Sequence, residues 1–252
     1  MNKKEIFIAA YHGGLGDNLQ FSTLPELYAK KGFDVYVPEG FYFRNQEICD
    51  LVWGHNPFVK GVKKGVWNAG DTPEIGHKVL NSNCISNWEL LHGFKPTNKY
   101  PKVYYSPNKI ENLNNTILID LTSISTNYNA ERVNKEVEKV KLSFPDKRFR
   151  TISFKKNLNP ATPQSPAHNG VFKNFNCESE DRIEVQSIFQ YCDLMASVAG
   201  IVTLHNGSSH LSSAIKKYNT NLISMCIIPE EQFKNNKDRA VFIFDNVEYI
   251  LV

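Results

Sequence analysis

A glycine-rich turn near the start of the chain ends in a carboxylate that could serve as a general base. The turn consists of His12, Gly13, Gly14, Leu15, Gly16 and Asp17. Glycines let a backbone turn tightly and approach a ligand, and ligands of open α/β sheets bind beyond the carboxyl ends of strands. In that position Asp17 could accept a proton from a substrate. The alternative is that Asp17 only caps the helix that follows.

A second turn combines small hydroxyl side chains with a glycine at the start of a helix. It consists of His205, Asn206, Gly207, Ser208, Ser209 and His210. Backbone N–H groups at a helix N-terminus attract anions, and serine hydroxyls beside them suit a diphosphate. The alternative is a serine-rich capped turn in which His210 is a core histidine with its hydrogen bonds satisfied.

Each turn needs a strand before it and a helix after it. The first lies between an apolar run, Glu5–Ala10, and a segment with helical periodicity, Asn18–Lys31. A second short apolar run, Asp34–Val37, follows. Strand, turn, helix and strand within about 33 residues predict a βαβ unit with parallel strands.

The second half of the chain repeats this α/β pattern. A stretch rich in Pro and Asn, Lys95–Leu113, separates the halves and is typical of a linker. The predicted fold class is α/β, with two Rossmann-like lobes, residues 1–110 and 115–252, and a cleft between them. In the second lobe we expect strands at Thr116–Leu121, Arg148–Phe154, Ile201–Leu204, Asn221–Ile227 and Val241–Phe244, and helices at Ala130–Leu142, Ser179–Val198 and His210–Lys217.

Composition narrows the functional class. The chain has 252 residues, a net charge of +3 and 22% charged residues, as expected for a globular protein and not for a dedicated nucleic-acid-binding domain. No apolar run approaches the roughly 18 residues of a membrane span, so no transmembrane segment is predicted. The five cysteines form no CxxC pair, which disfavours a zinc site or disulfide scaffold and favours a cytoplasmic location.

Together the two turns resemble the signatures of the glycosyltransferase family 9 heptosyltransferases, whose fold is GT-B. In that family a Gly-x-Gly-Asp turn follows the first strand, as Gly14–Asp17 does here, and a Thr-Pro-like step follows it, here Ser22–Pro25. The family's second signature, roughly Asp-Thr-Gly-x-x-His-Leu-x-x-Ala, is similar to His205–Ala214, and Trp88–Phe94 is similar to a helix near the end of the acceptor lobe.

The resemblance implies an inverting glycosyltransferase that moves a sugar from a nucleotide-diphosphate sugar to an acceptor hydroxyl. The N-terminal lobe would hold the acceptor, with Asp17 as the catalytic base. The C-terminal lobe would hold the donor through the second turn and through Lys155 or Lys156. No cofactor is implied, and the absence of any Asp-x-Asp in the sequence favours a transferase that needs no metal.

The resemblance leaves two questions open. His205 stands where the family has an aspartate, which leaves the donor sugar open. It also favours an alternative, a non-catalytic nucleotide or nucleotide-sugar binding protein of the same fold. The acceptor is either a glycan or a hydroxymethylated base in phage DNA, in the cytoplasm of a bacterium or of a phage-infected cell. The DNA option depends on a basic loop, Lys60–Lys64, near Trp53 and Trp67, which could follow phosphates or be an ordinary solvated turn.

Overall fold

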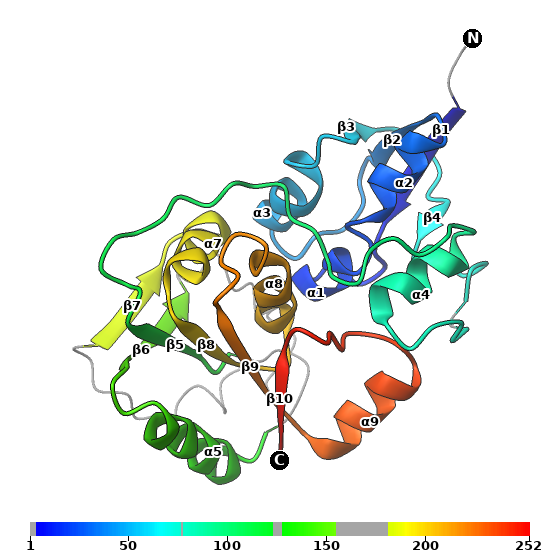
Figure 1. The fold of residues 1–252 in the computed structure, drawn as a ribbon. Coiled ribbons are helices and arrows are strands. Elements are labelled where there is room, and N and C mark those ends of the chain that lie inside the picture. The colour runs from blue at the N-terminus through cyan, green and yellow to red at the C-terminus, as the bar shows by residue number, and fades with distance from the viewer. Residues whose placement is uncertain (1–3, 77, 123–127, 155–180) are drawn as a thin grey trace. The chain divides into compact units, whose positions relative to one another are not determined.

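The structure is a computed structural model that describes residues 4–76, 78–122, 128–154 and 181–252. The chain divides into two units, each with its own parallel sheet (Figure 1). The first comprises Met1–Tyr105 and Lys234–Asp245, and the second comprises Ser106–Phe233 and Asn246–Val252. The sequence analysis instead placed every residue from 115 onward in the second lobe.

Four parallel strands form the sheet of the first unit. Their order is β3 (Val59–Lys63), β2 (Phe33–Pro38), β1 (Lys4–Ala9) and β4 (Ala69–Gly70). From β1 the chain runs to β2 on one side, and it later returns to pair β4 with the other side of β1. The strand order therefore reverses at β1. The carboxyl ends of β1 and β4 mark the topological switch point, where open α/β sheets bind ligands.

The single helix predicted for Asn18–Lys31 is wrong, because two short helices occur there. Helix α1 spans Leu15–Leu19 and α2 spans Leu24–Lys30. Pro25 lies in the first turn of α2, where a residue without an N–H group is tolerated, whereas in the middle of a longer helix it would break a hydrogen bond. The helices that follow β2 in this unit are α3 (Gln46–Cys49), the π-helical turn η1 (Asp50–Gly54) and α4 (Cys84–Leu91).

The basic loop predicted at Lys60–Lys64 is also wrong, because most of it forms the edge strand β3. Lys63 forms an ion pair with Glu5 on β1. Trp53, one of the two tryptophans expected near the loop, is 1% exposed. Its indole Nε1 donates a hydrogen bond to Asn18 Oδ1 at 2.8 Å. Trp53 is therefore a core residue and offers no face to a base.

The second unit contains a six-stranded parallel sheet. The strand order is β10 (Glu248–Leu251), β9 (Ile223–Ile228), β8 (Gly200–Leu204), β5 (Thr116–Asp120), β6 (Arg148–Phe154) and β7 (Arg182–Val185). From β5 the chain goes to β6 and β7 on one side, and then to β8 on the other side of β5. The switch point of this sheet lies between the carboxyl ends of β5 and β8, where Asp120 pairs with Thr203.

Helices cover both faces of this sheet. Helix α5 (Ala130–Ser143) lies on one face, and α7 (Ile188–Ser197) and α8 (Gly207–Ile215) lie on the other (Figure 1). The helix predicted at Ala130–Leu142 is confirmed, and its three valines are buried against apolar side chains of the central strands. Helix α9 (Glu230–Asp238) crosses the division between the units. No helix in the described part of the chain is long and apolar enough to cross a bilayer.

Two predicted elements of the second lobe need correction. The helix expected at Ser179–Val198 begins only at Ile188, because the Ser187 side chain caps α7, and β7 occupies part of the earlier stretch. The strand expected at Val241–Phe244 does not form. Phe242 there has a φ of 58°, a left-handed conformation that is incompatible with a regular strand. The C-terminal strand is β10 instead.

Replacing Gly70 by alanine should destabilise the protein more than replacing Gly40. Both glycines have left-handed φ angles, +95° and +75°, in which an L-residue costs about 1–2 kcal/mol. At Gly70 a Cβ atom would also lie 2.0 Å from the carbonyl oxygen of Ala9, whereas at Gly40 no described atom lies within 4 Å. Urea unfolding followed by circular dichroism measures both losses. Equal losses would contradict the close packing of β4 on β1.

Candidate functional site

The first predicted turn lies at the switch point of the first sheet. Gly13, with a φ of +60°, turns the chain after β1 so that α1 begins at Leu15. Asp17 lies in the first turn of α1 and accepts a hydrogen bond from the Gly14 N–H group. Asp17 therefore does cap its helix. Because a carboxylate accepts several hydrogen bonds, this contact is compatible with a role as a base.

The pKa of the Asp17 carboxyl is raised above its usual value. Burial is the largest cause, because it disfavours the charged form, and the Asp71 carboxylate acts in the same direction. Arg44, His12 and the Gly14 N–H group lower the pKa but do not offset burial. A carboxylate with a raised pKa binds a proton more strongly than an exposed one does, which suits proton abstraction near neutral pH.

The glycines of the first turn make room for these side chains. A Cβ atom at Gly14 would lie 2.4 Å from Asp17 Oδ2 and 3.6 Å from Arg44 Cζ. A Cβ atom at Gly13 would lie 2.5 Å from the carbonyl oxygen of Tyr42. Glycine is therefore required at Gly13, where both the left-handed φ and the Tyr42 backbone exclude a side chain, whereas at Gly14 a side chain would displace the Asp17 carboxylate. The other two predicted residues of this turn are Gly16, which is buried in α1, and His12, which is exposed.

Arg44 and Asp71 are site residues that the sequence analysis missed. The Arg44 N–H group donates to the carbonyl oxygen of Gly13 at 3.1 Å, and the Asp71 N–H group donates to that of Ala9 at 3.3 Å. Asp71 directly follows β4, and so it reaches the first turn through strand pairing. Neither residue belongs to a local pattern, so no signal near them in the sequence could have identified them.

The second predicted turn lies at the switch point of the second sheet. His205 follows β8, and Asn206 caps α8 by accepting hydrogen bonds from the N–H groups of Ser208 (2.8 Å) and Ser209 (3.3 Å). The Ser209 hydroxyl and the Asn206 backbone complete a capping box. Asn206 thus satisfies two of the amide groups that were expected to bind a diphosphate. The backbone N–H group that we expect to face an anion is therefore that of Gly207, at the positive end of the helix dipole.

The two histidines that flank this turn are buried. His205 is 5% exposed and His210 is 3% exposed. Their rings meet edge to face with centroids 5.3 Å apart. The backbone N–H group of His205 donates a hydrogen bond to the Tyr128 hydroxyl at 3.0 Å. His210 is therefore a buried core residue, and in its burial it matches the alternative interpretation of this turn.

The sequence analysis also missed polar residues at the end of β5. Asp120 is fully buried, and Thr122 follows two residues later. Asn206 Nδ2 donates to the carbonyl oxygen of Thr122, so the second turn is joined to this segment. A signal was present here, because a carboxylate that ends an otherwise apolar run is typical of a strand leading into a site.

Lys155 and Lys156, the predicted phosphate contacts, lie outside the described residues. Within the described ranges, no group of three or more His, Cys, Asp or Glu side chains could hold a metal ion.

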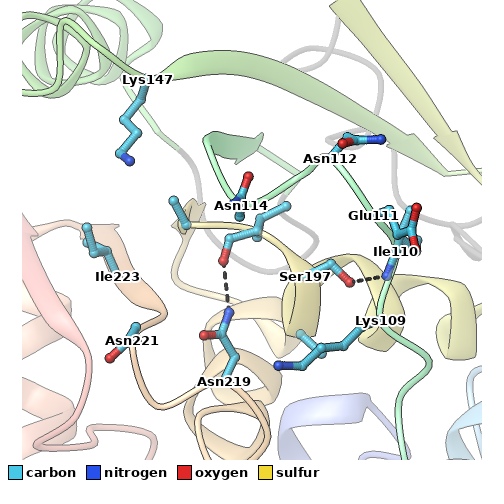
Figure 2. A pocket seen from close by; sticks show the side chains of 13 residues that line it. Lys109, Ile110, Glu111, Asn112, Asn114, Lys147, Ser197, Asn219, Asn221 and Ile223 are labelled. Carbon is cyan, nitrogen blue, oxygen red and sulfur yellow. Dashed lines mark hydrogen bonds between the residues drawn. The ribbon is translucent and has the colours of Figure 1, made fainter.

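A surface hollow of about 700 Å³ lies elsewhere in the second unit (Figure 2). Lys147, which precedes β6, and Asn221, which precedes β9, are among its lining residues. The hollow is therefore at the amino ends of these strands, the opposite end of the sheet from the second turn. It contains none of the predicted site residues.

Solved structures share this fold, although no protein-family model and no curated protein matches the sequence. The chain is similar to the bacterial iron-containing dodecameric glycosyltransferase TibC from enterotoxigenic E. coli, at 13% identity and a TM-score of 0.55. The similarity to the glycosyl transferase family 9 protein of Veillonella parvula has 11% identity and a TM-score of 0.53. The chain has the fold of the family 9 heptosyltransferases.

The extent of the match differs among these structures. The aligned region covers 89% of this chain but only 57% of TibC, and 99% of this chain and 85% of the Veillonella protein. For the E. coli ADP-heptose lipopolysaccharide heptosyltransferase II the values are 99% and 90%, with 11% identity and a TM-score of 0.54. The predicted α/β fold with two Rossmann-like halves is confirmed. At these identities the likeness establishes the fold, and the activity must be argued from the site.

Substitutions beside Asp17 should shift its pKa in opposite directions. Arg44→Gln removes a cation that favours the charged form, so the pKa should rise further. Asp71→Asn removes a nearby carboxylate, so the pKa should fall. NMR titration of the Asp17 side-chain carboxyl carbon measures both shifts against the wild type. Shifts in the same direction would contradict the arrangement of charges around Asp17.

Proposed function

We propose that the chain is a glycosyltransferase that moves a sugar from a nucleotide-diphosphate sugar to an acceptor hydroxyl. The observation that carries this proposal is the Asp17 carboxylate, which lies at the switch point of the first sheet with a raised pKa. The likeness to family 9 folds supports the same reaction class. The proposed reaction inverts the anomeric configuration, and it requires neither a cofactor nor a metal.

In the proposed mechanism Asp17 accepts the proton of the acceptor hydroxyl as that oxygen attacks the anomeric carbon. The bond from the anomeric carbon to the diphosphate oxygen breaks, and its electron pair leaves with the nucleotide diphosphate. Attack occurs from the face opposite the leaving group, so one displacement gives one inversion. The positive end of the α8 dipole at Gly207 would stabilise the charge that develops on the diphosphate.

The proposed donor is an ADP-linked sugar bound by the second unit. Support comes from a solved structure of TibC in complex with ADP-D-beta-D-heptose, to which this chain is similar with a TM-score of 0.56, at 12% identity and over 58% of that chain. The proposed contacts are the N–H group of Gly207 in the second turn, where α8 begins, and Lys155 or Lys156. The His205 side chain replaces the aspartate of the family signature and would change how the sugar is held.

For the acceptor we propose a glycan hydroxyl. The DNA alternative depended on an aromatic surface beside a basic loop, and burial of Trp53 removes part of that surface. We propose the cytoplasm as the location, because it would supply a nucleotide sugar. The non-catalytic alternative, a nucleotide-sugar binding protein, predicts that the donor binds but that no sugar is transferred. An assay of sugar transfer separates it from the enzyme.

Replacing Asp17 by asparagine should reduce turnover by roughly 10²–10⁴-fold, the usual contribution of a general base. Stability should not fall. The raised pKa means that folding favours protonated Asp17, so stability falls as the pH rises through the folded-state pKa. The neutral asparagine avoids that loss and can still accept the Gly14 hydrogen bond. ADP release from ADP-heptose in the presence of a glycan acceptor, together with the melting temperature at pH 7, measures both effects.

Asp146→Asn is the matched control, because it makes the same chemical change at an exposed residue of the turn before β6. It should leave both turnover and melting temperature unchanged. Wild-type turnover in Asp17→Asn would exclude Asp17 as the base. A wild type that binds ADP-heptose but transfers nothing to any acceptor would favour the non-catalytic alternative.

A further inference from the structure

A buried carboxylate lies at the centre of the second sheet. Asp120 is the last residue of β5, and it is fully buried. Its Oδ1 accepts hydrogen bonds from the Thr122 N–H group at 3.0 Å and the Thr122 hydroxyl at 2.6 Å. Its Oδ2 accepts one from the Tyr191 hydroxyl on α7 at 2.6 Å. Full burial means that Asp120 does not contact a ligand itself.

The contacts of Asp120 continue to the second turn by two routes. Through Thr122, whose carbonyl oxygen accepts from Asn206 Nδ2, Asp120 is linked to the residue that caps α8. Through Tyr191, whose hydroxyl is hydrogen-bonded to the Ser208 side chain, Asp120 is linked to the first turn of α8. Asn206 then accepts from the Ser208 N–H group at 2.8 Å. The hydrogen bonds form a closed ring that joins β5, α7 and α8.

The carboxylate fixes the direction of this ring. A carboxylate only accepts hydrogen bonds, so both Thr122 and Tyr191 must donate toward Asp120. The Tyr191 oxygen is then left to accept from the Ser208 hydroxyl. The carbonyl oxygen of Thr122 stays available to orient the Asn206 amide, and this amide can cap α8 only with its oxygen toward the Ser208 N–H group. The buried carboxylate thus orients the hydroxyls of Thr122 and Tyr191 and, through Tyr191, the hydroxyl of Ser208.

We propose that Asp120 is the positioning residue of the donor site, and that it acts through Thr122 and Tyr191 to hold the turn Asn206–Ser209 in the conformation that receives the donor diphosphate. This inference rests on the proposed function only for the identity of the ligand. It predicts that loosening the ring weakens nucleotide binding without changing how the acceptor is held. Charged hydrogen bonds inside a buried network are strong enough to have that effect.

The test is Tyr191→Phe, which removes one donor of the ring and retains the packing of the aromatic ring. We expect the dissociation constant for ADP, measured by calorimetry, to rise about 10-fold, as loss of a hydrogen bond to a charged group allows. The donor KM should rise in parallel, and the acceptor KM should stay at the wild-type value. Hydrogen exchange at the Ser208 and Ser209 amides should become faster. Asp120→Asn should change the same quantities in the same direction.

Tyr28→Phe is the matched control. It makes the same change in the first unit, where the Tyr28 hydroxyl is hydrogen-bonded to His92 Nδ1 at 2.9 Å, and it should leave ADP affinity unchanged. Wild-type ADP affinity in Tyr191→Phe, with only a lower melting temperature, would overturn the inference and leave the proposed function intact. A wild type that does not bind ADP would instead overturn the proposed donor. In that case unchanged amide exchange in Tyr191→Phe would overturn the positioning role as well, and faster exchange would support it.

Discussion

The order of strands in each parallel sheet determines where ligand chemistry can take place. Helices that connect parallel strands cover the faces of a sheet. Where one connection runs to one side of the sheet and another runs to the opposite side, the carboxyl ends of the two neighbouring strands stay accessible. β1 and β4 meet in this way in the first unit, and β5 and β8 do so in the second. The Asp17 turn and the capped turn of α8 directly follow β1 and β8, so their positions are consequences of topology.

The carboxylates at the two switch points have different surroundings. In the first unit the Asp17 carboxylate is partly buried with a raised pKa, so keeping it charged in the folded state has a free-energy cost. In the second unit Asp120 is fully buried but accepts three hydrogen bonds. The first arrangement suits a group that changes its protonation state. The second suits a group that holds its neighbours still, which is what a preorganised binding surface requires.

Local patterns in the sequence were sufficient to find both turns. Strand, turn and helix periodicity is encoded within about 30 residues, and Gly14–Asp17 and Asn206–Ser209 each lie in such a stretch. Arg44 and Asp71 could not be predicted, because they reach Asp17 only through the packing of other segments and the pairing of β4 with β1. Likewise, no local signal shows that Lys234–Asp245 belongs to the first unit, because this depends on a surface that the rest of the chain builds.

A crystal structure with ADP bound would test most directly whether the second unit holds the nucleotide while the first supplies the base. We expect the diphosphate at Gly207, beside the carboxyl ends of β5 and β8, with Asn206 still capping α8. The Asp17 carboxylate should make no contact with the nucleotide. A diphosphate bound at Gly13–Asp17 would contradict this assignment, because it would reverse the roles of the two units and remove Asp17 as the base.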